Sequence, residues 1–296
     1  MRICSFLPSA TEILFALGLG DSVMGVTFEC DHPPEARGKP VVVCSNLAQG
    51  LSEREIDRQV KMISGAGQSL YRLDVAKLRE IGPDLIVTQD LCHVCAASPA
   101  DLGAVLAQLP AVPEVIALSP RTLADVWGDI LRVGQATGRE REASRIVRGI
   151  EDRIRAIQEA RREGDPPRVL CLEWLDPPFV AGHWVPEMVT LAGGIDVLGR
   201  AGEPGYEVDW PAAIASAPEV VLVMPCGYHK PEVEEELRKI LFPARWQSMP
   251  AVRNGRVFAV DASAYFSRPG PRLVEGIAVM ADVFAGVTSA IAGKTA

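Results

Sequence analysis

The sequence predicts an α/β fold of two lobes joined by one long helix. Its 296 residues exceed what a single ordinary core holds and fit two domains of roughly 120–150 residues. Strand and helix patterns alternate in two separate stretches, which predicts helix-covered, mostly parallel sheets. We therefore expect an N-terminal lobe at residues 1–120, linker helices at 121–164 and a C-terminal lobe at 165–296.

The linker carries the longest helical pattern of the chain. Apolar residues recur at helical spacing from Ala143 to Ile157, and Arg and Glu fill the other face. A helix over residues 140–162 would be about 35 Å long, enough to run from one lobe to the other. An ordinary surface helix within one domain is the alternative interpretation.

In the first lobe a short apolar run, Ile3–Leu7, precedes Ser9 and Glu12, whose spacing predicts a capping box at the start of a helix. A second helix is predicted at Pro186–Ala192 in the second lobe. Further strands are predicted at Val23–Thr27, Leu85–Thr88, Val115–Leu118, Val169–Trp174, Val220–Met224 and Val257–Val260.

The composition excludes several classes of protein. Apolar residues make up 48% and charged residues 23%, which is typical of a globular chain. The net charge of −8 argues against a nucleic-acid partner. No apolar stretch is long enough to predict a membrane span.

The N-terminus and the cysteines predict a location. The first strand pattern starts at Ile3, without the basic and apolar regions of a secretory signal. Seven cysteines, an odd number, fit an exported disulfide framework poorly. We expect a cytoplasmic protein, and a periplasmic protein or lipoprotein only if a leader has been removed.

Ligands of parallel sheets collect at the carboxyl ends of the strands. Four of the seven cysteines and all four histidines follow predicted strands or lie in nearby loops. These segments include Phe28–His32, Gln89–Cys95, Glu173–Trp174, His183–Trp184, Pro225–His229, Asp261, Tyr265 and Arg268.

Cys92 and Cys95 form a C-x-x-C motif, which can bind a soft metal or form a redox disulfide. If Cys30 and Cys226 face the same cleft, four thiols could hold zinc or an iron–sulfur cluster.

Simpler structural roles stay open for other cysteines, histidines and tryptophans of the chain. Cys4, Cys44 and Cys171 are interpreted as small core residues, His32 could only cap a turn, and Trp174, Trp184 and Trp210 could only pack.

No G-x-S-x-G, P-loop or H-E-x-x-H motif is present, and no nucleophile–base pair stands out. The sequence therefore favours a binding protein over an enzyme, and catalysis at a metal centre stays open.

The whole chain resembles the class III, or helical-backbone, solute-binding proteins, and in particular their cobalamin-binding type. The resemblance rests on Leu7–Glu12, Gly25–Val26, Cys30–Ala36, Pro83–Ile86, Asp176–Phe179, Gly193–Gly194, Asp209–Pro211, Ala217–Glu219, Arg268 and Pro271–Arg272. It implies two Rossmann-like lobes, a rigid helical hinge and a ligand held in the cleft between the lobes. The implied ligand is cobalamin, another corrinoid or a related metal chelate.

The resemblance also implies which residues contact the ligand: Glu29, Trp174, His183, Trp210, Tyr265 and Arg268. Trp210 matches a cleft tryptophan of the cobalamin binders, and Tyr265 and Phe266 match an aromatic pair. Glu29 stands where a tyrosine is expected, Gln89 where a tryptophan is expected, and Ala264 where an aspartate is expected. A cleft histidine or cysteine could supply an axial ligand to cobalt or iron.

Importer-docking members of the family carry one exposed glutamate on each lobe. The matching positions here are Ala76 and Pro211, which cannot form ion pairs, although Glu80 or Glu203 could substitute. The sequence thus predicts a chelate-binding protein whose docking on an ABC transporter is doubtful. A cytoplasmic zinc or iron–sulfur metalloprotein and a conventional import receptor are the alternatives.

Overall fold

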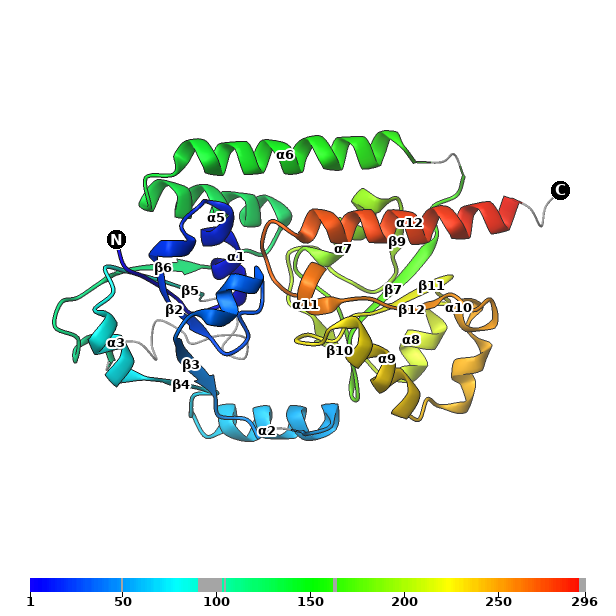
Figure 1. Cartoon of the computed structure of the whole chain (residues 1–296). Coiled ribbons are helices and arrows are strands. Elements are labelled where there is room, and N and C mark those ends of the chain that lie inside the picture. Colours follow the sequence, from blue (N-terminus) through cyan, green and yellow to red (C-terminus); the bar gives the residue numbers. More distant parts are fainter. Residues whose placement is uncertain (49, 90–102, 104, 162–163, 293–296) are drawn as a thin grey trace. The chain divides into compact units, whose positions relative to one another are not determined.

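The computed structural model of the chain describes residues 1–48, 50–89, 103, 105–161 and 164–292 (Figure 1). These residues form two compact units. Unit 1 comprises Met1–Pro120 and Asp125–Val147, and unit 2 comprises Arg121–Ala124 and Arg148–Ala296. The predicted α/β class with two sheet-containing domains is therefore confirmed, whereas the limits of a separate linker at 121–164 stay a prediction.

Unit 1 contains a six-stranded sheet in the order β4-β3-β2-β1-β5-β6, in which only the β3–β4 pair is antiparallel. The chain moves outward from β1 in both directions, so the strand order reverses beside β1. The strands are β1 (Ile3–Ser5), β2 (Val23–Thr27), β3 (Val41–Ser45), β4 (Tyr71–Leu73), β5 (Leu85–Gln89) and β6 (Glu114–Leu118). β5 is buried along its whole length, as expected for a central parallel strand covered on both faces.

The helices of unit 1 follow these strands. They are α1 (Pro8–Ala16), the 3₁₀ turns η1 (Gly20–Ser22) and η2 (Pro34–Gly38), α2 (Glu53–Gly65), α3 (Val75–Ile81) and α5 (Leu123–Ala136), whose first two residues belong to unit 2. The predicted capping box at Ser9 is wrong. Helix α1 begins at Pro8, which suits the first helical position because proline lacks an N–H and has a preset φ, and Ser9 and Glu12 are both buried.

Helix α6 (Glu140–Glu159) is the long helix that the sequence predicts, and it ends three residues before the predicted limit. At 1.5 Å per residue its 20 residues span about 30 Å. A tight turn joins α5 to α6, with Gly138 at a φ of 66°. A Cβ added at Gly134 would lie 2.5 Å from that of Ala143, so glycine allows these two helices to approach closely.

Unit 2 contains a second sheet in the order β10-β8-β7-β11-β12, with β9 also paired to β7. β7, β9, β11 and β12 pair in parallel, and β8 pairs antiparallel with both β7 and β10. The strands are β7 (Arg168–Leu175), β8 (Pro178–Val180), β9 (Ile195–Asp196), β10 (Tyr206–Glu207), β11 (Val220–Val223) and β12 (Val257–Ala259).

The helices of unit 2 are α7 (Val185–Ala192), α8 (Trp210–Ala215), α9 (Lys230–Lys239), the 3₁₀ turn η3 (Ala244–Ser248), α10 (Pro250–Arg253), α11 (Ala262–Tyr265) and α12 (Leu273–Ala292). Helices α7 and α12 pack against each other, and α9 packs against β12 (Figure 1). The central strand β11 is fully buried. In the part of the chain that the structure describes, no helix combines the length and the apolar content that a membrane crossing requires.

Candidate functional site

The carboxyl ends of β7, β11 and β12 bring several of the predicted residues to one edge of the unit 2 sheet. Trp174 lies near the end of β7, and its ring meets that of Tyr228 edge-on at 5.9 Å. The amide of Cys226 donates to the carbonyl oxygen of Glu173 at 3.2 Å, so the loop after β11 is bound to β7. This edge therefore carries two half-buried aromatic rings and the exposed thiol of Cys226.

His183 and Trp184 precede α7 and stack on each other at 5.5 Å. The indole N–H of Trp184 donates to the carbonyl oxygen of Phe266 at 2.8 Å, next to Tyr265. Trp184 thus contacts His183 through its ring and the residue after Tyr265 through its N–H group. The predicted contact of Tyr265 with a ligand stays a prediction, and its ring lies 5.8 Å from the Arg272 guanidinium.

The backbone of His183 is in the left-handed region, with a φ of 52°. Two hydrogen bonds hold it there: the His183 amide donates to the Glu203 carbonyl at 2.6 Å, and the Gly202 amide donates to the His183 carbonyl at 2.9 Å. Burial, with a smaller contribution from Arg121, lowers the pKa of His183 below its usual range. The ring is therefore neutral at pH 7, and its buried Nδ1 has no hydrogen-bond partner among the described residues.

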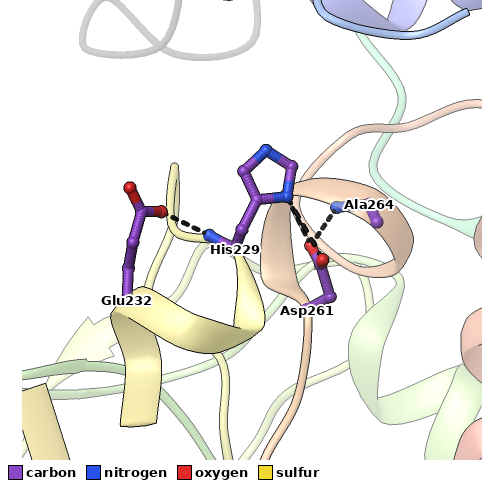
Figure 2. A network of polar contacts seen from close by, with 4 residues as sticks. All are labelled: His229, Glu232, Asp261 and Ala264. Atoms are coloured by element: carbon purple, nitrogen blue, oxygen red, sulfur yellow. Dashed lines mark hydrogen bonds and ion pairs between the residues drawn. The ribbon is translucent and has the colours of Figure 1, made fainter. Parts of the chain in front are cut away.

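The same edge carries a histidine–carboxylate pair that was not among the residues predicted to bind a ligand. Figure 2 shows His229, at the start of α9, facing Asp261, at the start of α11. Nδ1 of His229 lies 3.0 and 3.2 Å from the two carboxylate oxygens of Asp261. The sequence signal was present, since both residues follow strands, but they lie 32 positions apart, which hides the pairing.

The other predicted ligand contacts lie in different surroundings. Trp210 packs edge-on against Phe242 and Trp246 at 5.5 and 5.4 Å, and these rings belong to the hydrophobic core cluster of unit 2. Packing, the alternative interpretation for this tryptophan, thus accounts for its position. Arg268 follows α11 and is half-buried, and its contact with a ligand stays a prediction.

In unit 1, the predicted residues Glu29 and Cys30 follow β2, and the thiol of Cys30 is buried among hydroxyl groups. Its Sγ lies 3.0 Å from Oγ1 of Thr11 and 3.3 Å from Oγ1 of Thr27. Thr11 in turn donates to Oγ of Ser5 at 2.8 Å, and Ser5 donates to the carbonyl oxygen of Leu7. The thiol of Cys30 thus has hydrogen-bond partners within its own unit.

The predicted four-cysteine metal site stays a prediction. Cys92 and Cys95 lie outside the described residues, and Cys30 and Cys226 belong to different units. Within the residues that the structure describes, no group of three or more His, Cys, Asp or Glu side chains gathers closely enough to hold a metal ion. Cys4 and Cys171 are core residues, as interpreted from the sequence; burial raises the pKa of Cys4 to about 12 and that of Cys171 well above its usual range.

A cavity of about 200 Å³ in unit 2 does not coincide with this edge of the sheet. It is lined by the ends of α6 and α7 and by α12. Arg161 borders it and donates to the carbonyl oxygens of Thr190 and Leu191, which caps the C-terminus of α7. A helix-capping arginine therefore lines this cavity, and none of the predicted ligand residues lines it.

The chain matches the family described as periplasmic binding protein along residues 3–264. The chain belongs to the periplasmic binding protein family. One relative is YvrC of Bacillus subtilis, named as an uncharacterized ABC transporter substrate-binding lipoprotein, which is 26% identical over 95% of this chain and 79% of its own length. Another is the vitamin B12-binding protein of Vibrio cholerae, 22% identical over 93% of this chain and 86% of its own length.

Among solved structures, the periplasmic heme-binding protein RhuT of Roseiflexus sp. RS-1 has a TM-score of 0.72 and 27% identity, covering 97% of this chain and 99% of RhuT. This periplasmic binding protein is thus a solute-binding protein related to vitamin B12- and heme-binding proteins, as the sequence predicted. The predicted cytoplasmic location is wrong, because these relatives are a lipoprotein and periplasmic proteins. The doubt about transporter docking is not supported either, because YvrC is named as a transporter's substrate-binding protein.

Proposed function

We propose that this protein works outside the cytoplasm as the substrate-binding component of an ABC importer and captures a metal chelate of the tetrapyrrole type, a corrinoid or a heme. The observation that carries the proposal is the set of ring-bearing side chains at the carboxyl edge of the unit 2 sheet. Trp174 and Tyr228 are half-buried there. His183 and Tyr265 are also half-buried, and the ring of Trp184 stacks on His183 while its N–H group donates to Phe266, next to Tyr265. Partly exposed aromatic faces suit a large, flat ligand.

Support for this ligand class also comes from the relatives, whose names include both vitamin B12-binding and heme-binding proteins. Corrins and porphyrins share a flat macrocycle around a metal, and that shared chemistry is what the edge of the sheet would recognise.

Binding is tested by titrating the purified protein with cyanocobalamin and with hemin, followed by calorimetry and by visible absorption. We expect one of the two to bind with measurable heat, and Trp174→Ala to weaken that binding about tenfold, since one buried aromatic contact contributes about 1 kcal/mol or more. Leu241→Ala, at a side chain that is 95% exposed in unit 2, is the control and should bind as the wild type does. Absence of heat and of spectral change with both chelates would rule the proposal out.

Transporter docking is proposed with Glu80 on α3 and Glu203 before β10 as the carboxylates that replace the two missing family glutamates. Both side chains are exposed in their own unit. Stimulation of the cognate importer's ATPase by the wild type, reduced in the Glu80→Gln, Glu203→Gln double variant, is the expected result. Equal stimulation by the double variant would exclude these two residues as docking contacts.

A further inference from the structure

Asp261 orients the imidazole of His229, and two further hydrogen bonds fix the backbone that carries it. Its Nδ1 faces both oxygens of the Asp261 carboxylate. Its backbone amide donates to Oε2 of Glu232 at 2.7 Å (Figure 2). The loop that carries it is bound to the Asp261 segment by the Ser263 amide, which donates to the Tyr228 carbonyl at 3.0 Å. The ring is therefore preorganised while its side chain stays 40% exposed.

Helix capping does not account for the pairing of these two side chains. The α9 cap uses the backbone amide of His229, and the α11 cap uses Oδ1 of Asp261, which accepts from the Ala264 amide at 2.8 Å. Asp74 and Asp209 cap α3 and α8 in the same way, by accepting from Lys77 and Ala212, and neither cap involves an imidazole. The histidine ring at Asp261 is thus an addition to an otherwise ordinary cap.

The pairing has a defined chemical consequence. A carboxylate at Nδ1 accepts a hydrogen bond from the Nδ1–H group, which favours the tautomer with the ring's lone pair on Nε2 and makes Nε2 a stronger ligand for a metal. Figure 2 shows this second nitrogen on the side of the ring away from Asp261. Carboxylate–histidine pairs of this kind orient histidines that bind metals.

One imidazole is enough for a metal that is already held by a macrocycle. A corrin or porphyrin fills four positions around its cobalt or iron, so the protein needs to supply only an axial ligand. The ring of Tyr228, directly before His229, meets Trp174 edge-on, so the loop that carries the imidazole also carries aromatic surface for the macrocycle.

We propose that His229 coordinates the metal of the bound chelate through Nε2, with Asp261 as its positioning residue. The inference rests on the proposed function and names the residue that would select a chelate by its metal. It distinguishes His229 from His183, whose Nδ1 is buried and whose ring stacks on Trp184.

The test uses the full chain with hemin, with aquocobalamin and with metal-free protoporphyrin IX. For the metal chelate that the wild type binds, we expect an absorption spectrum typical of an imidazole-ligated metal. His229→Ala should lose that spectrum and bind about 10–100-fold more weakly. Metal-free protoporphyrin IX, where it binds, should bind the wild type and His229→Ala equally, because only coordination is removed. Added imidazole should restore the spectrum in His229→Gly.

Asp261→Asn keeps an oxygen for the α11 cap but loses the carboxylate at Nδ1. We expect it to shift the spectrum and weaken binding of the metal chelate, while the matched cap variant Asp74→Asn changes neither. Circular dichroism checks that every variant is folded.

The outcomes separate the two proposals. If the wild type binds neither metal chelate, the proposed function fails and this inference fails with it. If the wild type binds one of them and folded His229→Ala shows the same spectrum and affinity, only the inference about His229 is overturned. The inference is also overturned if His229→Ala loses metal-free protoporphyrin IX as strongly as hemin, since His229 would then act by packing alone.

Discussion

In unit 1 the residues around the ends of β1 and β2 point small polar side chains inward, whereas unit 2 carries larger rings at the ends of β7, β11 and β12. Ser5, Thr11 and Cys30 are 0%, 0% and 5% exposed and bond to one another. Trp174 and Tyr228 of unit 2 are half-buried, and the side chain of His229 is 40% exposed.

The two edges therefore differ in what their polar groups can do. A polar group that is buried and hydrogen-bonded stabilises its own unit, because its bonding capacity is already used. A half-exposed ring with a fixed orientation can still bind a ligand. The polar groups at the unit 1 edge thus stabilise their own unit, and the rings at the unit 2 edge, which we call the recognition edge, are the ones that we propose to bind the ligand.

The largest effect is expected from disturbing the tight backbone that supports the unit 2 edge. Gly182 lies against residues 203–205, and a Cβ at this position would lie 2.5 Å from the Gly205 amide nitrogen and 2.6 Å from the Pro204 carbonyl carbon. Because backbone atoms cannot yield as a side-chain end can, Gly182→Ala should destabilise the protein by about 3 kcal/mol or more. Urea unfolding followed by circular dichroism measures this loss.

Gly149→Ala is the matched control for that substitution. It lies within α6, and a Cβ there would meet nothing within 4 Å. Alanine favours the helix over glycine, so this variant should be more stable than the wild type by about 0.5–1 kcal/mol. A Gly182→Ala protein as stable as the wild type would show that residues 203–205 do not pack closely on Gly182.

An intermediate effect is expected from opening the hydroxyl network of unit 1. Thr11→Val removes the hydroxyl that links Ser5 to Cys30, and both partners stay buried. Ser5 keeps its bond to Leu7 and Cys30 keeps its contact with Thr27, so the variant loses two hydrogen bonds. At about 0.5–1.5 kcal/mol for each bond, the free energy of unfolding should fall by about 1–3 kcal/mol.

Thr137→Val in the same unit is the control, because the Thr137 hydroxyl bonds to helical carbonyls of α5, chiefly that of Val133. Such bonds back to the preceding turn contribute little, and we expect a change below about 0.5 kcal/mol. If both variants lost the same stability, the buried network would have no special role in unit 1.

Much of the fold could be predicted because its strongest signals are local. Buried runs such as Val220–Met224 and the apolar stripe of residues 140–162 determine element types within a few residues. The strands β3 and β4 were not predicted, because β3 depends on pairing with β2 and β4 on pairing with β3. The start of α1 was misplaced by two residues, since Leu7 and not Ser9 is the N-cap residue and the helix begins at Pro8.

The candidate site could be predicted only as a set of residues. The rule that ligands bind at the carboxyl ends of strands identified Trp174, His183 and Tyr265. It could not show that His229 faces Asp261, because that contact depends on the relative placement of α9 and α11. It also could not show that the hydroxyls of Thr11 and Thr27 would contact the thiol of Cys30.

The smallest effect concerns His183, the strained residue of the recognition edge. A residue with a Cβ atom at a φ of 52° destabilises the folded state by about 1 kcal/mol through backbone strain, which glycine does not have. The His183→Gly protein should therefore be more stable than the His183→Ala protein by about that amount. Glycine is thus expected to be more stable than alanine at position 183, whereas alanine is expected to be more stable than glycine at position 149.

The wild type should also lose stability as the pH falls below about 6.5, because the unfolded chain then binds a proton that burial, aided by Arg121, disfavours in the folded state. Both variants should lose this part of the pH dependence in urea unfolding at pH 5 and pH 8. If alanine proved as stable as glycine at position 183, the bonds to Gly202 and Glu203 would not hold the backbone in the left-handed region, and the recognition edge would be less rigid than its hydrogen bonds indicate.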